Sequence, residues 1–141
     1  MSQRLRLGWG MNPTRDSTSR PSHPGTGKTG ASSTGFQALD MALAMIQAVR
    51  HPLERILQHD TSLAKQLRAA ATSVALNLGE GRRRIGKDRL HFWRIAAGSA
   101  DESCMCLRIA TSWGFVAADD VAEALGLLDR ILAICWTLTH R

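Results

Sequence analysis

The sequence has no tyrosine, and aromatic residues make up only 5% of its 141 positions. Strands favour aromatic and β-branched side chains, so this scarcity suits close helix packing better than a β-sandwich. No apolar run approaches the roughly 20 residues that a membrane-spanning helix needs, and the N-terminus lacks the apolar stretch of a secretory signal. A hydrophobic content of 44% predicts one ordinary domain with a sizeable core.

Cysteine is also scarce, with Cys104, Cys106 and Cys135 as the three examples. Residues two apart on a helix do not face each other, so Cys104 and Cys106 are not expected to chelate a metal together. All three lie in apolar helical patterns, where a free cysteine behaves as a small hydrophobe. We therefore expect reduced thiols and a cytoplasmic location, with no metal and no other cofactor.

Acidic residues are outnumbered, with 12 Asp and Glu against 18 Lys and Arg and a formal net charge of +6. A positive excess points to anionic partners, nucleic acid first, and it also serves solubility. Residues 1–35 carry five basic residues against Asp16, a net charge of +4, together with three Pro and six Gly. They show no apolar period, so we predict a disordered basic tail over residues 1–35.

Other interpretations of the tail stay open at this point. Its Arg-rich, Ser-rich and acid-poor composition also describes an organellar transit peptide, and a start codon assigned too early would place the functional beginning near Met11 or later. Residues 22–29 resemble a phosphate-binding loop with Ser22 in place of the first glycine. Such a loop needs a buried strand before it, and no strand is predicted there, so nucleotide hydrolysis is not expected.

Residues 36–141 show the 3–4 spacing of apolar residues that is typical of amphipathic helices. In the first helix the apolar face continues past Pro52, which predicts a kink rather than a break. Asp60 is the expected N-cap of the second helix, and the third is expected to begin near Asp88 and to stop at Gly114. The predicted faces are Phe36, Leu39, Leu43, Ile46 and Val49; Leu63, Leu67, Ala70, Val74 and Leu78; Phe92, Ala96, Ser99, Ser103, Cys106, Ala110 and Trp113; and Val121, Leu125, Leu128, Leu132, Cys135 and Leu138.

Four helices joined by short links predict an all-α, antiparallel up-and-down four-helix bundle. Several apolar residues flank the seams, and one protomer is not expected to cover them all, which favours assembly of several copies. These flanking residues are Leu107, Ile109, Leu127, Ile131 and Ile134.

Two helical segments carry polar and small residues where a plain helix would use Leu and Lys: Asn77, Glu80 and Gly81 in the first, and Gly98, Ser99 and Glu102 in the second. Glycine inside a helix costs about 1 kcal/mol relative to alanine, so we expect close helix approach there, with Gly98 in a seam of small residues.

The carboxylates suggest either a metal site or a buried hydrogen-bond network. A di-iron bundle site needs two Glu-x-x-His units, whereas this chain has one Asp88-x-x-His91. We therefore predict a network in which Glu80 and Glu102 accept hydrogen bonds from Asn77, Ser99, or an arginine such as Arg68 or Arg94. No nucleophile and base are paired in the sequence, so no enzymatic activity is expected.

A basic cluster follows the first of these segments, with Glu80 and Asp88 as its only acids and a net charge of +4. Arginine binds phosphate in bidentate fashion, and Trp93 within the cluster would stack on a base if it were exposed. We predict an RNA- or DNA-binding site here. The alternatives are a solvated loop with no ligand, or arginines that pair with acids such as Asp119 and Asp120 of another protomer. The cluster is Arg82, Arg83, Arg84, Lys87, Arg89 and Arg94.

The pattern Ser73-Val74-x-x-Asn77-Leu78-Gly79-Glu80-Gly81, then a basic loop, then Ile95-Ala96-x-Gly98-Ser99-x-x-Glu102, resembles a bacterial four-helix bundle protein family over roughly residues 36–139. That family is associated with intervening sequences in 23S ribosomal RNA genes. The chain departs from it at Gly79, where alanine is usual, and at Arg89, where an aromatic residue is common.

The resemblance implies a homo-oligomer, commonly a ring-shaped pentamer. Related accessory variability determinant proteins of diversity-generating retroelements bind nucleic acid and a reverse transcriptase, so the resemblance implies those two partners. The expectation from the sequence is a non-enzymatic, cytoplasmic nucleic-acid-binding accessory protein. The alternative is a protein–protein adaptor with no nucleic-acid role.

Overall fold

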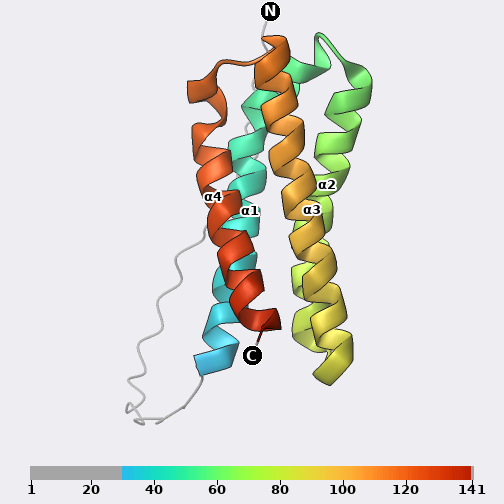
Figure 1. Cartoon of the computed structure of the whole chain (residues 1–141), viewed down its shortest axis with the longest axis vertical. Helices are drawn as coiled ribbons and strands as arrows, with labels where there is room; N and C mark the ends of the chain where they lie inside the picture. Colours follow the sequence, from blue (N-terminus) through green and yellow to red (C-terminus); the bar gives the residue numbers. More distant parts are fainter. Residues whose placement is uncertain (1–29, 141) are drawn as a thin grey trace, which may run out of the picture.

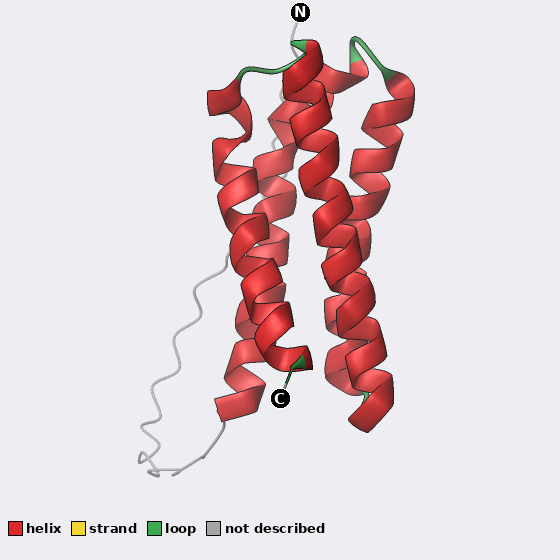
Figure 2. Ribbon diagram, viewed as in Figure 1, coloured by secondary structure: helices red, strands yellow, loops and turns green. Residues whose placement is uncertain are grey.

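The computed structural model describes the backbone of residues 30–140 and the side chains of residues 37–140. Within that range it holds four helices and no strand: α1 (Gly30–Leu57), α2 (Thr61–Arg83), α3 (Gly86–Trp113) and α4 (Ala118–Thr139). The helices alternate in direction, and the loops lie at the two ends (Figures 1 and 2). Helix α3 packs against α2 and α4, and α1 packs against the same two helices. The predicted all-α, antiparallel up-and-down bundle is confirmed.

The predicted tail lies mostly outside the described residues, as does the segment from Ser22 that resembles a phosphate loop. Helix α1 begins at Gly30, ahead of the expected start at Phe36. The tail therefore stays a prediction. None of the described helices is long and apolar enough to cross a membrane.

The buried face of helix α1 is shifted from the predicted one, although Val49 is buried as predicted; the side chain of Phe36 lies outside the described residues. Leu43 is 50% exposed, and Leu39 and Ile46 are half-buried at the margin. The centre of the interface passes instead through Ala38, Ala42, Met45, Val49, Pro52 and Ile56. In the first turns, Ala38 and Ala42 occupy the centre, so the larger Leu39 and Leu43 lie toward the margin there. The helix continues through the buried Pro52, as expected.

Helix α2 follows its sequence pattern closely. The Asp60 side chain accepts a hydrogen bond from the Leu63 backbone N–H at 2.9 Å, which is the expected N-cap. All five residues of the predicted face are buried: Leu63, Leu67, Ala70, Val74 and Leu78.

Helix α3 buries most of its predicted seam. The prediction that Trp113 belongs to this seam is wrong, because its side chain is 72% exposed. Trp113 is the last residue of the helix, where no further turn covers it. The chain leaves the helix through Gly114 in the left-handed conformation, and the Phe115 N–H donates to the Ala110 carbonyl at 2.9 Å. Because α3 contacts both α2 and α4, it also buries Trp93, Ala100, Cys104 and Leu107.

Helix α4 begins with Asp119 and Asp120 in its first turn, where carboxylates favour the positive end of the helix dipole. Its predicted seam is buried except for Leu125 and Leu132, which are half-buried, and Ala124 and Ile131 complete it.

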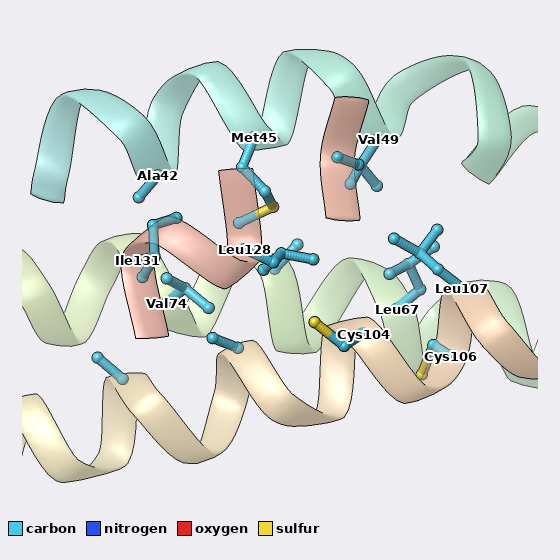
Figure 3. Packing of buried hydrophobic residues seen from close by; sticks show 14 of the residues in the cluster. Ala42, Met45, Val49, Leu67, Val74, Cys104, Cys106, Leu107, Leu128 and Ile131 are labelled. Atoms are coloured by element: carbon cyan, nitrogen blue, oxygen red, sulfur yellow. The ribbon is translucent and has the colours of Figure 1, made fainter. Parts of the chain in front are cut away.

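Side chains from all four helices meet in one apolar core (Figure 3). Met45, Leu67, Leu107 and Leu128 are each fully shielded from solvent. The three cysteines are free and buried, as their apolar pattern predicted. Burial raises the pKa of Cys135 to about 11, and burial together with the carboxylates of Asp129 and Asp101 raises the pKa of Cys104 to about 11.

Candidate nucleic-acid interface

The basic cluster lies at one end of the bundle, where α2 ends and α3 begins (Figure 1). The link between these helices is two residues long, Arg84 and Ile85, and Ile85 is 81% exposed. Helix α3 then opens at Gly86, whose φ of 58° lies in the left-handed region that favours glycine. The short link brings basic residues from both helices to the same end of the molecule.

Two of the arginines hold this turn together. Arg84 donates from Nε and Nη2 to Glu80 Oε1, at 2.9 and 2.7 Å, and its guanidinium carbon lies 5.5 Å from the centre of the Phe92 ring. Arg89 Nε donates to the Arg84 carbonyl at 2.7 Å, and the Arg89 guanidinium lies 5.5 Å from the Trp93 ring centre. These contacts fix the turn and the orientation of both guanidinium groups.

The other members of the cluster point to solvent. Arg82, Arg83, Lys87 and Arg94 are all exposed. The side chains of Arg83, Lys87 and Arg94 form no hydrogen bond or ion pair with any residue between 37 and 140. Their charges are therefore not neutralised by any described residue and are accessible to an anion.

Acidic residues gather at the opposite end of the bundle. The segments on either side of the α1–α2 and α3–α4 turns, residues 54–61 and 113–123, hold five acids against Arg55, a net charge of −4. Those acids are Glu54, Asp60, Asp119, Asp120 and Glu123. The chain thus separates its charge along the length of the bundle.

Trp93 does not lie where a base could stack on it. Its side chain is only 7% exposed, and it packs beside Gly81. A Cβ atom at position 81 would come within 2.7 Å of Trp93 Cδ1 and Nε1, so glycine is required for this approach. The expectation of close helix packing is met at Gly81, and the suggested stacking role of Trp93 is wrong.

A small polar cluster joins α2 to α3 further along. The Ser73 and Ser99 hydroxyls are 2.7 Å apart, and Asn77 Nδ2 donates to the Ser73 carbonyl and hydroxyl at 2.8 and 3.0 Å. Ser103 Oγ donates to the Ser99 carbonyl at 2.9 Å. Two residues of the predicted network, Asn77 and Ser99, therefore belong to one cluster with Ser73.

The carboxylates of the predicted network lie outside that cluster. Glu80 forms a surface ion pair with Arg84, and Glu102 is exposed. Arg68 and Arg94, the suggested donors, are exposed as well. Burying a carboxylate is costly unless it is well paired, and the surface positions avoid that cost. The predicted buried network is therefore wrong: Glu80 does accept hydrogen bonds from an arginine, but this is Arg84 at the surface, and neither carboxylate bonds to Asn77 or Ser99.

Gly98 also lies outside the seam in which it was expected. It is exposed, and no atom lies within 4 Å of the place that a Cβ would occupy. The buried residues Ala96, Ser99, Ala100 and Ser103 share one side of α3, and at about 100° per residue Gly98 lies on the opposite side. A larger residue at position 98 would therefore not force the helices of one protomer apart.

Apolar residues left on the surface differ in part from those expected. Leu107 and Ile131 are fully buried in the core, so they leave nothing for another copy to cover. Leu127 and Ile134 are half-buried. Helices α2 and α3 instead expose Leu76, Ile95, Met105 and Ile109, at 67, 38, 56 and 37%.

The model of the family described as 23S rRNA-intervening sequence protein matches residues 37–136, most of the helical bundle. The chain belongs to this family. The resemblance given by the Asn77–Gly81 and Gly98–Glu102 segments is thereby confirmed at the level of the family. No curated protein matches the chain.

A crystal structure shows the same fold in another protein. It is a protein of unknown function from the S23 ribosomal protein family of Bacteroides thetaiotaomicron, with 14% sequence identity and a TM-score of 0.64. The match covers 77% of this chain and 99% of the other. At that identity the similarity concerns the fold alone.

The sequence pattern did not single out Trp136, in the last turns of α4. Its side chain is 63% exposed, and its ring lies parallel to the His140 ring, with centres 4.5 Å apart and an interplanar angle of 12°. His140 Nδ1 lies 2.9 Å from the Trp136 carbonyl oxygen and 3.1 Å from Thr139 Oγ1. One signal in the sequence could have indicated an exposed Trp136. It directly follows Cys135, a member of the predicted buried seam, and so lies one position off that seam.

Proposed function

We propose that this protein is a non-enzymatic nucleic-acid-binding protein that contacts phosphates through the end of the bundle formed by the α2–α3 turn. The observation that carries the proposal is the set of three exposed cations, Arg83, Lys87 and Arg94, without a partner among the described residues. Phosphate contacts by Lys and Arg supply most of the affinity in nonspecific nucleic-acid binding. The family description, which names an rRNA intervening sequence, makes RNA the first ligand to test.

The anchored arginines support this role in a second way. Arg84 and Arg89 are held by Glu80, by Phe92 and Trp93, and by one backbone carbonyl. Each guanidinium has five N–H donors, so donors remain for a phosphate. A turn that is already ordered has less conformational entropy to lose on binding.

We further propose that several copies assemble through the outer face of α2 and α3. Leu76, Ile95, Met105 and Ile109 are exposed on these two helices, and large apolar side chains left on the surface are candidates for an interaction site. The ring of five and the reverse transcriptase partner rest on the family resemblance and remain predictions. In an assembly each protomer would add its own basic end, and the proposed setting is the cytoplasm.

The competing proposal is a protein adaptor that uses the same apolar face and binds no nucleic acid. Both proposals share the exposed leucine, isoleucine and methionine side chains, but only the first uses Arg83, Lys87 and Arg94. The two are therefore separated by nucleic-acid binding and its dependence on these cations.

The test is the affinity of the full chain for a structured RNA and a DNA duplex, measured at several salt concentrations by fluorescence anisotropy. The wild type is compared with a triple variant, Arg83→Ser, Lys87→Ser and Arg94→Ser. A matched control, Arg50→Ser, Arg55→Ser and Lys65→Ser, removes three exposed cations elsewhere. The slope of log K against log salt is about −0.9 per phosphate contact on duplex DNA, so loss of three contacts flattens it by roughly 2 to 3.

The control triple should bind like the wild type. Equal loss of affinity in both triples would show that net charge alone matters and would reject a localised site. Absence of binding by the wild type at low salt would favour the adaptor.

A further inference from the structure

An exposed aromatic pair lies at the basic end of the bundle. The C-terminal end of α4, which carries Trp136 and His140, is at the same end as the α2–α3 turn (Figure 1). Helix α4 packs directly against α3, the helix that carries Lys87 and Arg94. A nucleic acid whose phosphates reach these cations would therefore be bound at the end of the bundle that also carries Trp136.

The Trp136 ring is both accessible and held in place. It is 63% exposed, so most of its surface is open to a ligand. The parallel His140 ring supports it at 4.5 Å, and His140 is itself held by the Trp136 carbonyl and the Thr139 hydroxyl. An aromatic platform that is already ordered loses little entropy when a base stacks on it.

We propose that Trp136 is a stacking platform for a base of single-stranded nucleic acid whose phosphates are bound by Arg83, Lys87 and Arg94. The proposal rests on the proposed function and adds the strandedness of the ligand. Aromatic side chains beside a basic surface are the usual arrangement for binding single strands, because every base offers a π face. A continuous duplex keeps its bases stacked and paired, so it offers no free face to Trp136.

The other exposed tryptophan among residues 37–140 provides the comparison. Trp113 is 72% exposed and lies parallel to Phe115, with ring centres 6.4 Å apart. It lies at the opposite, acidic end, where α3 turns into α4 (Figure 1). Trp113 thus resembles Trp136 in exposure and stacking but lacks the cations that would bring a strand to it.

The test compares Trp136→Ala with Trp113→Ala in the full chain, with a dye-labelled oligouridylate and an RNA duplex of the same length as probes. Removing an aromatic side chain on which a base stacks typically lowers the affinity by about 5- to 150-fold per base. We expect the oligouridylate Kd of Trp136→Ala to rise within that range and the duplex Kd to change less than about twofold. Trp113→Ala should leave both unchanged, and Trp136→Phe should recover part of the affinity.

A second readout requires no loss of the side chain. In a Trp9→Phe, Trp113→Phe background, which leaves the buried Trp93 and Trp136, oligouridylate should quench tryptophan emission, and the duplex should not. Equal oligouridylate affinity of Trp136→Ala and the wild type, with binding still dependent on Arg83, Lys87 and Arg94, would overturn the stacking role and leave the proposed function standing. Failure of the wild type to bind either probe would reject both.

Discussion

The indole of Trp93 occupies the space that any side chain at position 81 would need: Cδ1 and Nε1 lie 2.7 Å from the Cβ position of Gly81. This contact joins the last turns of α2 to the first turns of α3 beneath the basic turn. Trp93 also lies under Arg89. The contact therefore supports both the packing of the two helices and the orientation of an arginine at the proposed interface.

We expect Gly81→Ala to destabilise the protein by about 1–3 kcal/mol, the usual cost of overpacking a well-packed site. The ring atoms of Trp93 belong to a large, buried side chain that has little room to move. Urea unfolding followed by circular dichroism measures the effect. The matched control is Gly98→Ala, which meets open space and should stabilise the helix by up to about 1 kcal/mol. Equal unfolding midpoints for the two variants would contradict the assignment.

Asp60→Ala should lower the free energy of unfolding by about 1 kcal/mol, because the Leu63 N–H loses its acceptor. Asp60→Asn keeps an acceptor oxygen and should cost much less. Thermal melts of the two variants and the wild type provide the measurement. A loss in Asp60→Asn as large as that in Asp60→Ala would point to charge rather than capping.

The buried thiols should make the protein less stable at high pH. The folded-state pKa of Cys104 and of Cys135 is about 11, above the ordinary value of 9.0, so the unfolded chain releases these protons first. The stability from the neutral thiols is fully present below about pH 9 and is lost as pH rises toward 11. Melting temperatures from pH 7 to 11 should fall more steeply for the wild type than for Cys135→Ala. Parallel curves would show that Cys135 contributes nothing to this dependence.

Assembly through the α2–α3 face predicts that the wild type elutes as an oligomer, five protomers by family resemblance, in light scattering at micromolar concentration. Leu76→Glu places a charge on this face, where Leu76 is 67% exposed, and should shift the mass toward the monomer without lowering helicity. Leu43→Glu, at a 50% exposed position on α1, is the matched control and should keep the wild-type mass. A monomeric wild type would refute the proposed assembly.

The bundle could be predicted because its signals are local. The Asp60 cap, the Gly114 stop and the evenly spaced leucines of α2 each depend on a few neighbouring residues. The buried face of α1 could not be predicted in the same way, since Ala38 and Ala42 at its centre offer little hydrophobic contrast.

The site was harder to predict for two reasons. Some of its contacts join different helices, and others depend on whether a polar side chain points to the core or to solvent. Gly81 and Trp93 are in contact across the α2–α3 turn. Their separation along the sequence does not predict this contact. Glu80 and Glu102 lie next to buried positions in the sequence, yet both turn toward solvent. The basic cluster was visible in the composition. Its division into the anchored Arg84 and Arg89 and the exposed Arg83, Lys87 and Arg94 depends on contacts between the two helices, which the sequence does not show.

Because its two ends carry opposite charges, the attraction of the bundle for a polyanion depends on the ionic strength in a particular way. Helix α3 has 28 residues and spans ~42 Å, whereas the Debye length is about 8 Å at physiological salt. A phosphate at the Arg83 end is then shielded from Asp119 and Asp120, so the acidic end does not weaken its attraction. At about 0.01 M salt the Debye length reaches about 30 Å, and the distant carboxylates begin to repel the same polyanion. A polyanion at the Arg83 end thus meets a cationic surface in physiological salt and the field of an electric dipole in dilute buffer.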